Sequence, residues 1–212
     1  MFSITTVILA AGKSTRFKAT SSKLVYPLCG LPIISHVYAI AKKISGKKVI
    51  VVCNKDNIKE LKSILKECTF VTQNLQKGTA DAIEQAKKKI KSNNVLVLFG
   101  DTPLITLSSI RKLIKNYLSS KVKASLIAFR TNKPYGYGRL VIKNNALEEI
   151  VEEINLNNYQ KKISLCNSGI LIAEKKTLFE NTKNIKTNII KKERYLPDIF
   201  KLLHINKLKT NY

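Results

Sequence analysis

The sequence predicts an α/β fold in which a mostly parallel central sheet is covered by helices on both faces. Three continuous apolar runs, Thr5–Leu9, Val49–Cys53 and Val95–Phe99, indicate strands that are buried on both sides. Segments with helical spacing of apolar residues lie between these runs, as a parallel sheet requires. Hydrophobic residues make up 44% of the 212-residue chain, enough for a sizeable core, so a disordered chain is excluded.

The first half of the chain alternates strands and helices. The run Thr5–Leu9 ends at a small, flexible turn, and helical spacing resumes over Leu31–Ala41. After Val49–Cys53, apolar residues at 58, 61, 64 and 65 form the stripe of an amphipathic helix. The other elements expected here are a strand at Phe70–Val71, a helix opening near Thr79 and a helix over Ile110–Leu118.

The second half predicts shorter strands and a more mixed sheet. The strands expected are Ala124–Arg130, Gly138–Lys143, Leu147–Glu152 and Ser164–Ala173, and a short helix covers Tyr195–Leu203. Asn144-Asn145 is a turn signal between two of these strands. The sequence contains no Ser/Gly-rich linker and no internal repeat, so we expect residues 1–212 to form a single domain.

The chain is strongly basic: 38 Lys and Arg against 14 Asp and Glu give a formal net charge of +24. Such a charge is compatible with nucleic-acid binding, because clustered basic groups release counterions from phosphates. The lysines are instead scattered as pairs and one triplet, Lys87–Lys89, and many fall on the polar faces of the expected helices. Solvated lysines are therefore favoured over a nucleic-acid partner, although the positive field would still attract nucleotide phosphates.

We expect a soluble, cytoplasmic protein. The longest apolar runs fall far short of the ~20 residues that span a bilayer, so no membrane partner is expected. Met1–Ser3 leads directly into a strand without a basic leader segment. The cysteines at 29, 53, 68 and 166 form no Cys-x-x-Cys pair, which favours buried free thiols in a reducing compartment over a zinc site. The sequence does not indicate an oligomeric state.

Two turns that follow strands carry residues suited to nucleotide binding. In Leu9–Arg16, small side chains let a phosphate approach backbone N–H groups, and Arg16 offers a planar fork for phosphate oxygens. The Walker and G-x-G-x-x-G patterns are absent. Asp101 follows the third apolar run, where ligands bind in open α/β sheets, and its carboxylate is suited to Mg²⁺. In isolation, a glycine turn is more often structural, and a capping or turn aspartate is about as common as a metal ligand.

Six motifs in a fixed order are more specific than either turn. Leu-Ala-Ala-Gly-x-x-Thr-Arg at 9–16 is followed by Lys23 and Gly30-x-Pro32. The others are Gln73-x4-Gly78-Thr79-Ala80-Asp81-Ala82, Phe99-Gly100-Asp101-Thr102-Pro103-Leu104, Tyr135-Gly136-Tyr137-Gly138-Arg139, Ile150-Val151-Glu152-Glu153 and Cys166-Asn167-Ser168-Gly169-Ile170. From residue 4 to about residue 203, the chain resembles the uridylyltransferase domain of bacterial N-acetylglucosamine-1-phosphate uridylyltransferases, which belong to the sugar nucleotidyltransferases.

The resemblance implies a Rossmann-like nucleotidyltransferase domain. Its reaction would join UTP and N-acetylglucosamine 1-phosphate, with Mg²⁺, into UDP-N-acetylglucosamine and pyrophosphate, a step toward peptidoglycan and the cell wall. The implied catalytic residues are Arg16 and Lys23, which would compensate charge at the attacked α-phosphate. The implied nucleotide-binding residues are Leu9, Ala10, Ala11, Gly12, Gln73, Gly78 and Thr79; the sugar-binding residues are Gly138, Glu152 and Asn167; and the metal ligand is Asp101. We interpret Arg139 and Glu153 as a surface ion pair without a role.

The C-terminal part departs from the family and leaves alternatives open. In the family, a second magnesium ligand, an asparagine, comes after a segment that Glu193–Asp198 resembles. In this chain, neither Asn206 nor Asn211 stands in a matching context. We also expect the chain to lack the family's C-terminal hexapeptide-repeat acetyltransferase domain. The chain is therefore either a short uridylyltransferase or a truncated, inactive domain that only binds nucleotide-sugars. Another sugar phosphate as the substrate is a further alternative.

Overall fold

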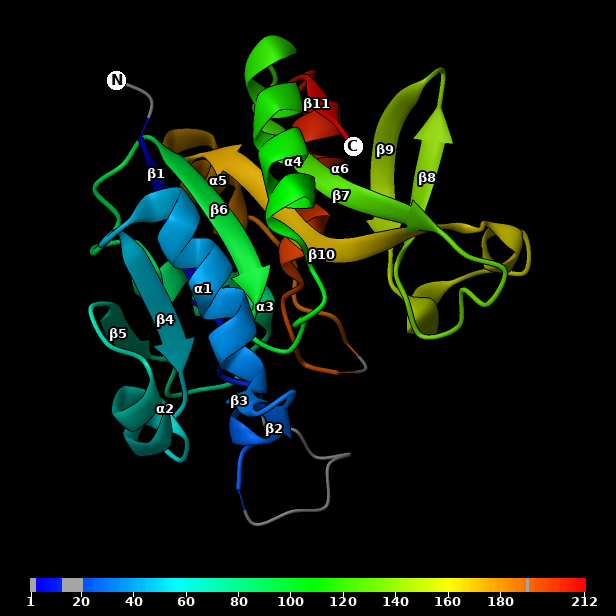
Figure 1. Cartoon of the computed structure of the whole chain (residues 1–212). Helices are drawn as coiled ribbons and strands as arrows, with labels where there is room; N and C mark the ends of the chain where they lie inside the picture. Colours follow the sequence, from blue (N-terminus) through cyan, green and yellow to red (C-terminus); the bar gives the residue numbers. More distant parts are fainter. Residues whose placement is uncertain (1–2, 13–20, 190) are drawn as a thin grey trace.

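A mixed β-sheet runs through the centre of the molecule (Figure 1). The computed structural model describes residues 3–12, 21–189 and 191–212. The strands of the sheet follow the order β11-β7-β10-β6-β1-β4-β5. In that order they span Thr210–Asn211, Ala124–Arg130, Leu165–Glu174, Asn94–Phe99, Ile4–Leu9, Val49–Cys53 and Thr69–Thr72. Strands β8 (Arg139–Lys143) and β9 (Ala146–Val151) form a hairpin that joins β10, and β2 (Pro27–Leu28) and β3 (Leu31–Pro32) form a small separate hairpin.

The direction of the strands confirms the expected mostly parallel sheet. β1 is parallel to β4 and to β6, and β4 is parallel to β5. β10 is antiparallel to both β6 and β7, and β11 is parallel to β7. Among the seven described strands of this path, β10 alone therefore runs against the others. The mixed character of the second half comes from β10 and from the β8–β9 hairpin, whose turn is the expected Asn144-Asn145.

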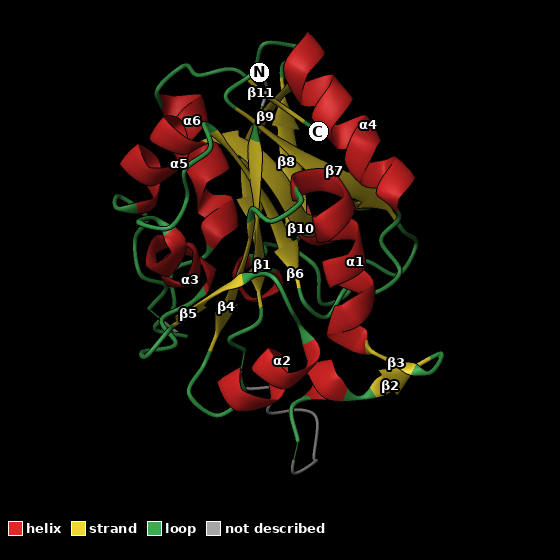
Figure 2. Cartoon of the chain, turned by 60° about the vertical axis from the view of Figure 1, so that its left-hand side comes forward, coloured by secondary structure: helices red, strands yellow, loops and turns green. Residues whose placement is uncertain are grey.

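Helices cover both faces of the sheet, as expected (Figure 2). On one face lie α1 (Ile33–Ser45), α2 (Ile58–Ile64) and α4 (Leu107–Ser119). On the other lie α3 (Thr79–Ala86), α5 (Lys175–Thr182) and α6 (Ile199–Ile205). Four short 3-10 turns complete the described elements: Lys23–Val25, Glu153–Asn155, Gln160–Lys162 and Leu196–Asp198. None of the helices among the described residues is long and apolar enough to cross a membrane.

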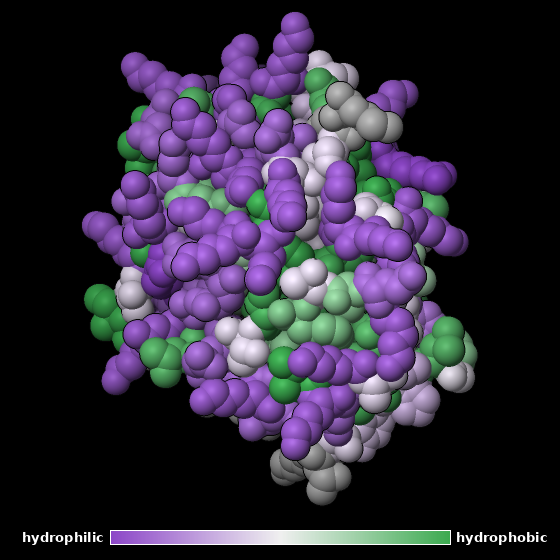
Figure 3. All heavy atoms as spheres, turned by 90° about the vertical axis from the view of Figure 1, so that its left-hand side faces the viewer, coloured by the Kyte–Doolittle hydropathy of each residue, from purple (hydrophilic) through white to green (hydrophobic). Residues whose placement is uncertain are grey.

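The outer sides of the helices carry the lysines. Lys87, Lys88 and Lys89 directly follow α3 and are exposed, as are Lys112 and Lys115 on α4. Figure 3 shows one face of the molecule on which long hydrophilic side chains cover most of the surface, with smaller hydrophobic areas between them. The positions of these lysines agree with the expectation that they are solvated side chains on polar helix faces.

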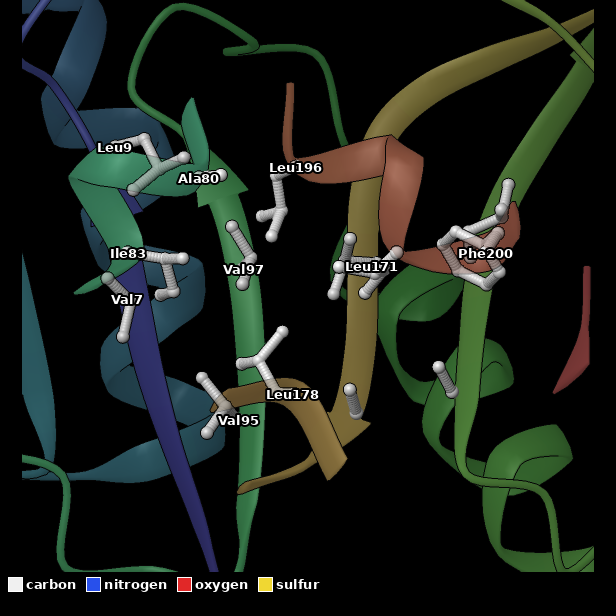
Figure 4. Packing of buried hydrophobic residues seen from close by; sticks show 14 of the residues in the cluster. Val7, Leu9, Ala80, Ile83, Val95, Val97, Leu171, Leu178, Leu196 and Phe200 are labelled. Carbon is white, nitrogen blue, oxygen red and sulfur yellow. The ribbon is translucent and has the colours of Figure 1, made fainter. Parts of the chain in front are cut away.

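The core is divided by the sheet into two apolar layers. Strand side chains alternate between faces, so Val7 and Leu9 of β1 belong to the same apolar layer as α3, α5 and α6, while Ile8 belongs to the layer of α1 and α4. Figure 4 shows the first layer, where Val97 of β6 lies among side chains from α3 and from the segment before α6. Because each fully buried aliphatic side chain contributes about 1.5–3 kcal/mol, these layers dominate the stability of the domain.

Some features were not expected from the sequence. The elements that the sequence did not predict are α5, β11 and the β2–β3 hairpin, all of which are short or weakly amphipathic. All four cysteines are free, and Cys53 and Cys166 are buried as expected. The expectation of a buried thiol is wrong for Cys29, which is exposed because it lies in the turn between β2 and β3 with a φ of 50°.

The order of the strands places a crevice beside β1. From β1 the chain passes outward to β4 and β5, and then returns to the other side of β1 as β6. At such a reversal the connections after neighbouring strands lead away from each other, and the carboxyl ends of the strands flank an open crevice. Residues 10–12, Gln73 and Asp101 directly follow β1, β5 and the β6–Gly100 turn at this edge of the sheet.

Candidate active site

A cleft of about 970 Å³ opens at the carboxyl ends of β1, β5 and β6. Nine of the residues to which the sequence analysis gave roles line it: Leu9, Ala10, Ala11, Gly12, Lys23, Gln73, Gly78, Thr79 and Asp101. Arg16 falls in residues 13–20, outside the described residues. The cleft thus brings together every described residue expected to bind the nucleotide or the metal, from four separate parts of the sequence.

Three side-chain amides donate hydrogen bonds to the carbonyl groups of the turn after β1. Asn57 Nδ2 donates to the Ala10 carbonyl at 2.7 Å, and the Ala11 carbonyl accepts from Asn54 Nδ2 at 3.1 Å and from Gln76 Nε2 at 2.9 Å. These bonds fix the direction of two successive peptide groups. A Cβ placed on Gly12 would meet no atom of the described chain within 4 Å, so the backbone here is open to a ligand.

Gln73 is buried and its orientation is set by its own neighbours. Its Nε2 donates to the Gly78 carbonyl at 3.0 Å and to Asp81 Oδ2 at 2.7 Å, while its backbone N–H donates to the Cys53 carbonyl at 2.8 Å. Because both amide hydrogens have protein acceptors, the side-chain oxygen of Gln73 is the atom suited to accept a hydrogen bond from a ligand.

Lys23 and Asp101 meet across the cleft. Lys23 Nζ lies 2.5 Å from Asp101 Oδ2, and the two side chains are 33% and 38% exposed. Asp101 extends from the turn after β6, and Lys23 from the 3-10 turn that leads into the β2–β3 hairpin. Within the described residues no group of three or more His, Cys, Asp or Glu side chains could by itself hold a metal ion. A cation at Asp101 would thus need oxygen ligands from elsewhere, and the phosphates of a nucleotide are such ligands.

The three residues expected to bind the sugar lie together but do not line this cleft. The Asn167 N–H donates to the Gly138 carbonyl at 2.9 Å. Glu152 Oε1 lies 3.3 Å from the position that a Cβ on Gly138 would occupy, so a larger residue would press on the carboxylate. Burial raises the pKa of Glu152, and the nearby charge of Asp198 raises it further.

Tyr195 links the two groups of residues. It lines the cleft, and its pKa is raised to about 12, mainly by burial, with the charges of Glu193 and Glu152 adding to the shift. Phe99 also lines the cleft and packs directly on Gly169, whose N–H donates to Asn167 Oδ1 at 2.9 Å, so the three residues expected to bind the sugar lie next to the cleft. An elongated ligand could therefore reach from Gly12 and Gln73 toward Gly138, Glu152 and Asn167.

Arg139 and Glu153 form an ion pair, but the expectation that it lies on the surface is wrong. The Arg139 side chain is 2% exposed, with Nη2 at 2.8 Å from Glu153 Oε2. Arg139 also donates to the carbonyls of Ile163, at 3.1 Å, and Tyr137. Glu153 Oε2 accepts from the Gly136 N–H at 3.2 Å. Arg139 is thus buried and Glu153 partly buried, and the pair ties the loop before β8 to the segment after β9, which carry Gly138 and Glu152.

Four further residues with polar or charged side chains line the cleft, and the sequence did not indicate a functional role for any of them: Gln76, Lys191, Glu193 and Tyr195. Glu193 and Tyr195 belong to the segment Glu193–Asp198, whose resemblance to a family segment could have indicated them, although the resemblance assigns them no contact.

Asn206 and Asn211 do not approach Asp101. Asn206 bonds to Asn181, and Asn211 pairs with the amino-terminal end of β7, at the opposite edge of the sheet.

An open α/β sheet with a turn of small residues, a lysine and a carboxylate at its strand reversal is typical of nucleotide-binding domains suited to phosphoryl or nucleotidyl transfer. Comparison with known families agrees with this class. The model of the MobA-like NTP transferase domain matches residues 6–163, well over half of the chain. The chain therefore belongs to the MobA-like NTP transferase domain family.

Individual relatives are similar over almost the whole chain. The chain is 40% identical over 212 residues to the bifunctional protein GlmU of Buchnera aphidicola subsp. Schizaphis graminum, covering 98% of this chain and 45% of that protein. It is 37% identical over 210 residues to GlmU of Streptococcus uberis, covering 96% of this chain and 45% of that protein. The chain thus spans about half the length of these curated relatives.

A solved structure supports the fold. A Bacillus anthracis protein described as a glucose-1-phosphate thymidylyltransferase, in complex with a sucrose, superposes with a TM-score of 0.84 at 20% identity. The match covers 99% of this chain and 86% of that one. At this identity the likeness shows that the two proteins share a fold.

Proposed function

We propose that this chain is a sugar-1-phosphate nucleotidyltransferase that converts UTP and N-acetylglucosamine 1-phosphate into UDP-N-acetylglucosamine and pyrophosphate. The observation that carries the proposal is the single cleft of about 970 Å³ in which Gly12, Lys23, Gln73 and Asp101 meet. The similarity to GlmU over nearly the whole chain supports the same conclusion.

The base would be selected by Gln73. With Nε2 donating to Gly78 and Asp81, the amide oxygen accepts from the base. Uracil carries a hydrogen on N3, whereas the N3 of cytosine is an acceptor. A hydrogen bond between the Gln73 oxygen and N3–H would therefore favour UTP over CTP.

The phosphates would lie between Gly12 and Lys23. An oxygen of the sugar phosphate attacks the α-phosphorus of UTP, the bond from this phosphorus to the oxygen bridging the β-phosphorus breaks, and pyrophosphate leaves. No side chain forms a covalent intermediate, so catalysis consists of positioning and charge compensation. The Lys23 ammonium is the described group that would compensate the charge developing at the α-phosphate, and we assign the same role to Arg16.

Asp101 fits a magnesium ion. Its carboxylate lines the cleft and is partly exposed, and magnesium commonly binds one or two protein carboxylates together with substrate phosphates and water. When bound, the ion would supply positive charge to the phosphates of UTP. The residues of this chain would contribute the Asp101 carboxylate and the adjacent Lys23 ammonium.

The sugar would bind at Gly138, Glu152 and Asn167. A carboxylate accepts hydrogen bonds from sugar hydroxyls, and an asparagine amide both donates and accepts. The absence of a side chain at Gly138 leaves room beside Glu152 Oε1, which lies 3.3 Å from the place of the missing Cβ.

The proposal is tested by measuring pyrophosphate release from each of the four nucleoside triphosphates with several sugar 1-phosphates and magnesium. We expect the highest kcat/KM for UTP with N-acetylglucosamine 1-phosphate. Asp101→Asn should lower kcat at least about 100-fold, the order of loss when a preorganised electrostatic group is removed. The matched control is Asp56→Asn, because Asp56 is exposed and lies outside the cleft.

Three results would contradict the proposal. Absence of pyrophosphate release with every pair of substrates would favour a domain that only binds nucleotide-sugars. A clear preference for another sugar phosphate would remove N-acetylglucosamine from the proposal but retain the reaction class. Full activity of Asp101→Asn would remove Asp101 from the metal site.

A further inference from the structure

One wall of the cleft is formed by residues 191–195, which belong to no helix or strand. Lys191, Glu193 and Tyr195 line the cleft from this segment, which lies between α5 and the 3-10 turn at Leu196–Asp198. A segment of this kind has no ladder of helix or strand hydrogen bonds to hold it. Its position depends on the individual contacts that it makes with its neighbours.

The backbone of this wall is bonded to the turn that carries Gly78 and Thr79, two of the residues expected to bind the nucleotide. The Arg194 N–H donates to the Lys77 carbonyl at 2.8 Å, and the Ala80 N–H donates to the Arg194 carbonyl at 3.0 Å. Two residues further along, Leu196 donates its N–H to Thr79 Oγ1 at 2.8 Å. The wall and the Gly78–Thr79 turn are therefore held against each other by main-chain bonds on both sides of Gly78.

Gly78 makes this close approach possible. Its φ is 97°, which glycine adopts without strain, and a Cβ at this position would lie 2.4 Å from the Arg194 oxygen and 2.6 Å from the Arg194 nitrogen. Backbone therefore packs directly on backbone. A small displacement of Arg194 would move the Gly78–Thr79 turn with it.

The Arg194 side chain anchors the wall to two other parts of the fold. Its Nη1 and Nη2 each lie 3.1 Å from a different carboxylate oxygen of Glu84 on α3. Its Nε donates to the Ile185 carbonyl at 3.2 Å, and Nη2 also donates to the Thr182 carbonyl at the end of α5. The Thr182 carbonyl also accepts from the Ile185 N–H at 3.2 Å, so the guanidinium adds further bonds to a turn that already closes the end of α5.

Only an arginine has the planar fork of donors that can meet these acceptors at once, whereas a lysine offers a single ammonium. The Arg194 side chain is 19% exposed and that of Glu84 is 27% exposed, so both are largely shielded from water. Arg194 is not among the residues that line the cleft. Any effect that it has on a ligand must be transmitted through the wall and the Gly78–Thr79 turn.

We propose that Arg194 is a positioning residue for the nucleotide. By joining α3 and the end of α5 to the wall, it fixes the distance between the wall and the Gly78–Thr79 turn, and so determines how tightly the base side of the cleft holds UTP. The inference rests on the proposed function, because it takes UTP as the nucleotide. Arg194 acts on nucleotide binding and not on the sugar end, where the buried Arg139–Glu153 pair holds the structure independently.

The test measures UTP binding to the full chain by calorimetry at 15 °C, together with the melting temperature and the KM values of both substrates. We expect Arg194→Gln to raise the Kd and the KM for UTP about tenfold, the order expected when hydrogen bonds to a charged group are lost. The KM for the sugar phosphate and kcat at saturating UTP should change less than about threefold. Arg194→Lys should restore only part of the affinity, since it keeps the charge without the fork.

The matched control is Lys201→Gln. Lys201 on α6 forms a 2.8 Å ion pair with Glu149, also between a helix and a neighbouring element but away from the cleft. This variant should leave the Kd for UTP unchanged. If Arg194→Gln does not fold, the test uses Glu84→Gln, because this variant keeps the bonds from Arg194 to Thr182 and Ile185. A two- to threefold higher Kd for UTP in Glu84→Gln would support the proposal.

Distinct results separate this inference from the proposed function. If the wild-type chain does not bind UTP, the proposed function and the inference both fail. If the wild-type chain binds UTP and Arg194→Gln binds it equally well, only the inference is overturned, even when the melting temperature falls, because the residue then has a purely structural role. If Arg194→Gln does not fold and Glu84→Gln leaves the Kd for UTP unchanged, the inference is likewise overturned.

Discussion

Asp198 carries a carboxyl group whose protonation depends on how the chain folds around it. Burial raises its pKa from 3.8 to about 6; Glu149 adds to the shift, and Lys201 opposes it. A carboxyl with a higher pKa in the folded chain than in the unfolded chain binds more protons when folded. The contribution of Asp198 to stability is therefore fully present below pH 3.8 and is lost as the pH rises through about 6.

We predict that Asp198→Asn stabilises the protein near pH 7.5 and has little effect near pH 4. The gain in the free energy of unfolding should be on the order of 1 kcal/mol, which is less than the full shift implies because the group is partly screened by solvent. Urea unfolding between pH 4 and 8 measures this, with the exposed Asp56→Asn as the control. A gain of equal size at both pH values would show that the carboxyl charge is not the cause.

The β8–β9 hairpin depends on one ion pair at its base. β8 begins at Arg139 and β9 ends at Val151, two residues before Glu153, so the Arg139–Glu153 bond closes the open end of the hairpin. The same bond holds the loop that contains Gly136 and Tyr137. Gly138 is adjacent to Arg139 in the sequence, and Glu152 is adjacent to Glu153. The ion pair therefore links the proposed sugar site to the hairpin.

We predict that Arg139→Met lowers the free energy of unfolding by about 3 kcal/mol, because it leaves a carboxylate and two carbonyls without their buried partner. The KM for the sugar phosphate should rise more than the KM for UTP. Chemical unfolding and two-substrate kinetics measure the two effects. The double variant Arg139→Met/Glu153→Gln should be less destabilised than Arg139→Met alone; an equal loss would mean that the charge of Glu153 is immaterial.

On the scale of the whole molecule, the net charge of +24 produces a positive field around a cleft that also contains lysines. The lysines are spread along the whole sequence as single residues, pairs and one triplet, and hydrophilic side chains cover most of the face shown in Figure 3. A diffuse field of this kind raises the local concentration of small anions without specifying a partner. Nucleotide triphosphates are anions of this type.

We predict that kcat/KM for UTP falls several-fold between 20 and 200 mM salt, because the Debye length shrinks from about 20 Å to about 7 Å over this range. Steady-state kinetics at saturating sugar phosphate measure the change. The comparison variant replaces Lys87, Lys88 and Lys89 with glutamine, which lowers the net charge by three without touching the cleft. It should reduce the salt dependence, whereas an unchanged dependence would show that only charges within the cleft matter.

Much of the framework could be predicted from local patterns. The strands Val49–Cys53 and Ala124–Arg130 have the predicted bounds, because uninterrupted β-branched and apolar residues favour buried strands wherever they occur. Gly12 and Asp101 could be proposed as ligand-binding residues because each follows a strand, and the carboxyl ends of parallel strands share one edge, whereas Gln73 was indicated only by the resemblance to the family. Elements such as α5 escaped prediction because its short, polar sequence becomes helical only where Leu178 and Phe179 are buried.

The sequence by itself determined the class of fold, the order of the motifs and the side chains available to the cleft, since these depend on residues close together in the chain. The tertiary structure alone decided which distant residues meet. It brings Arg194 to Glu84, 110 residues away, and Lys23 to Asp101, 78 residues away. It also buries Arg139, which the sequence suggested to be on the surface. Burial and long-range pairing depend on how the layers of the sheet and helices close, and no local pattern carries that information.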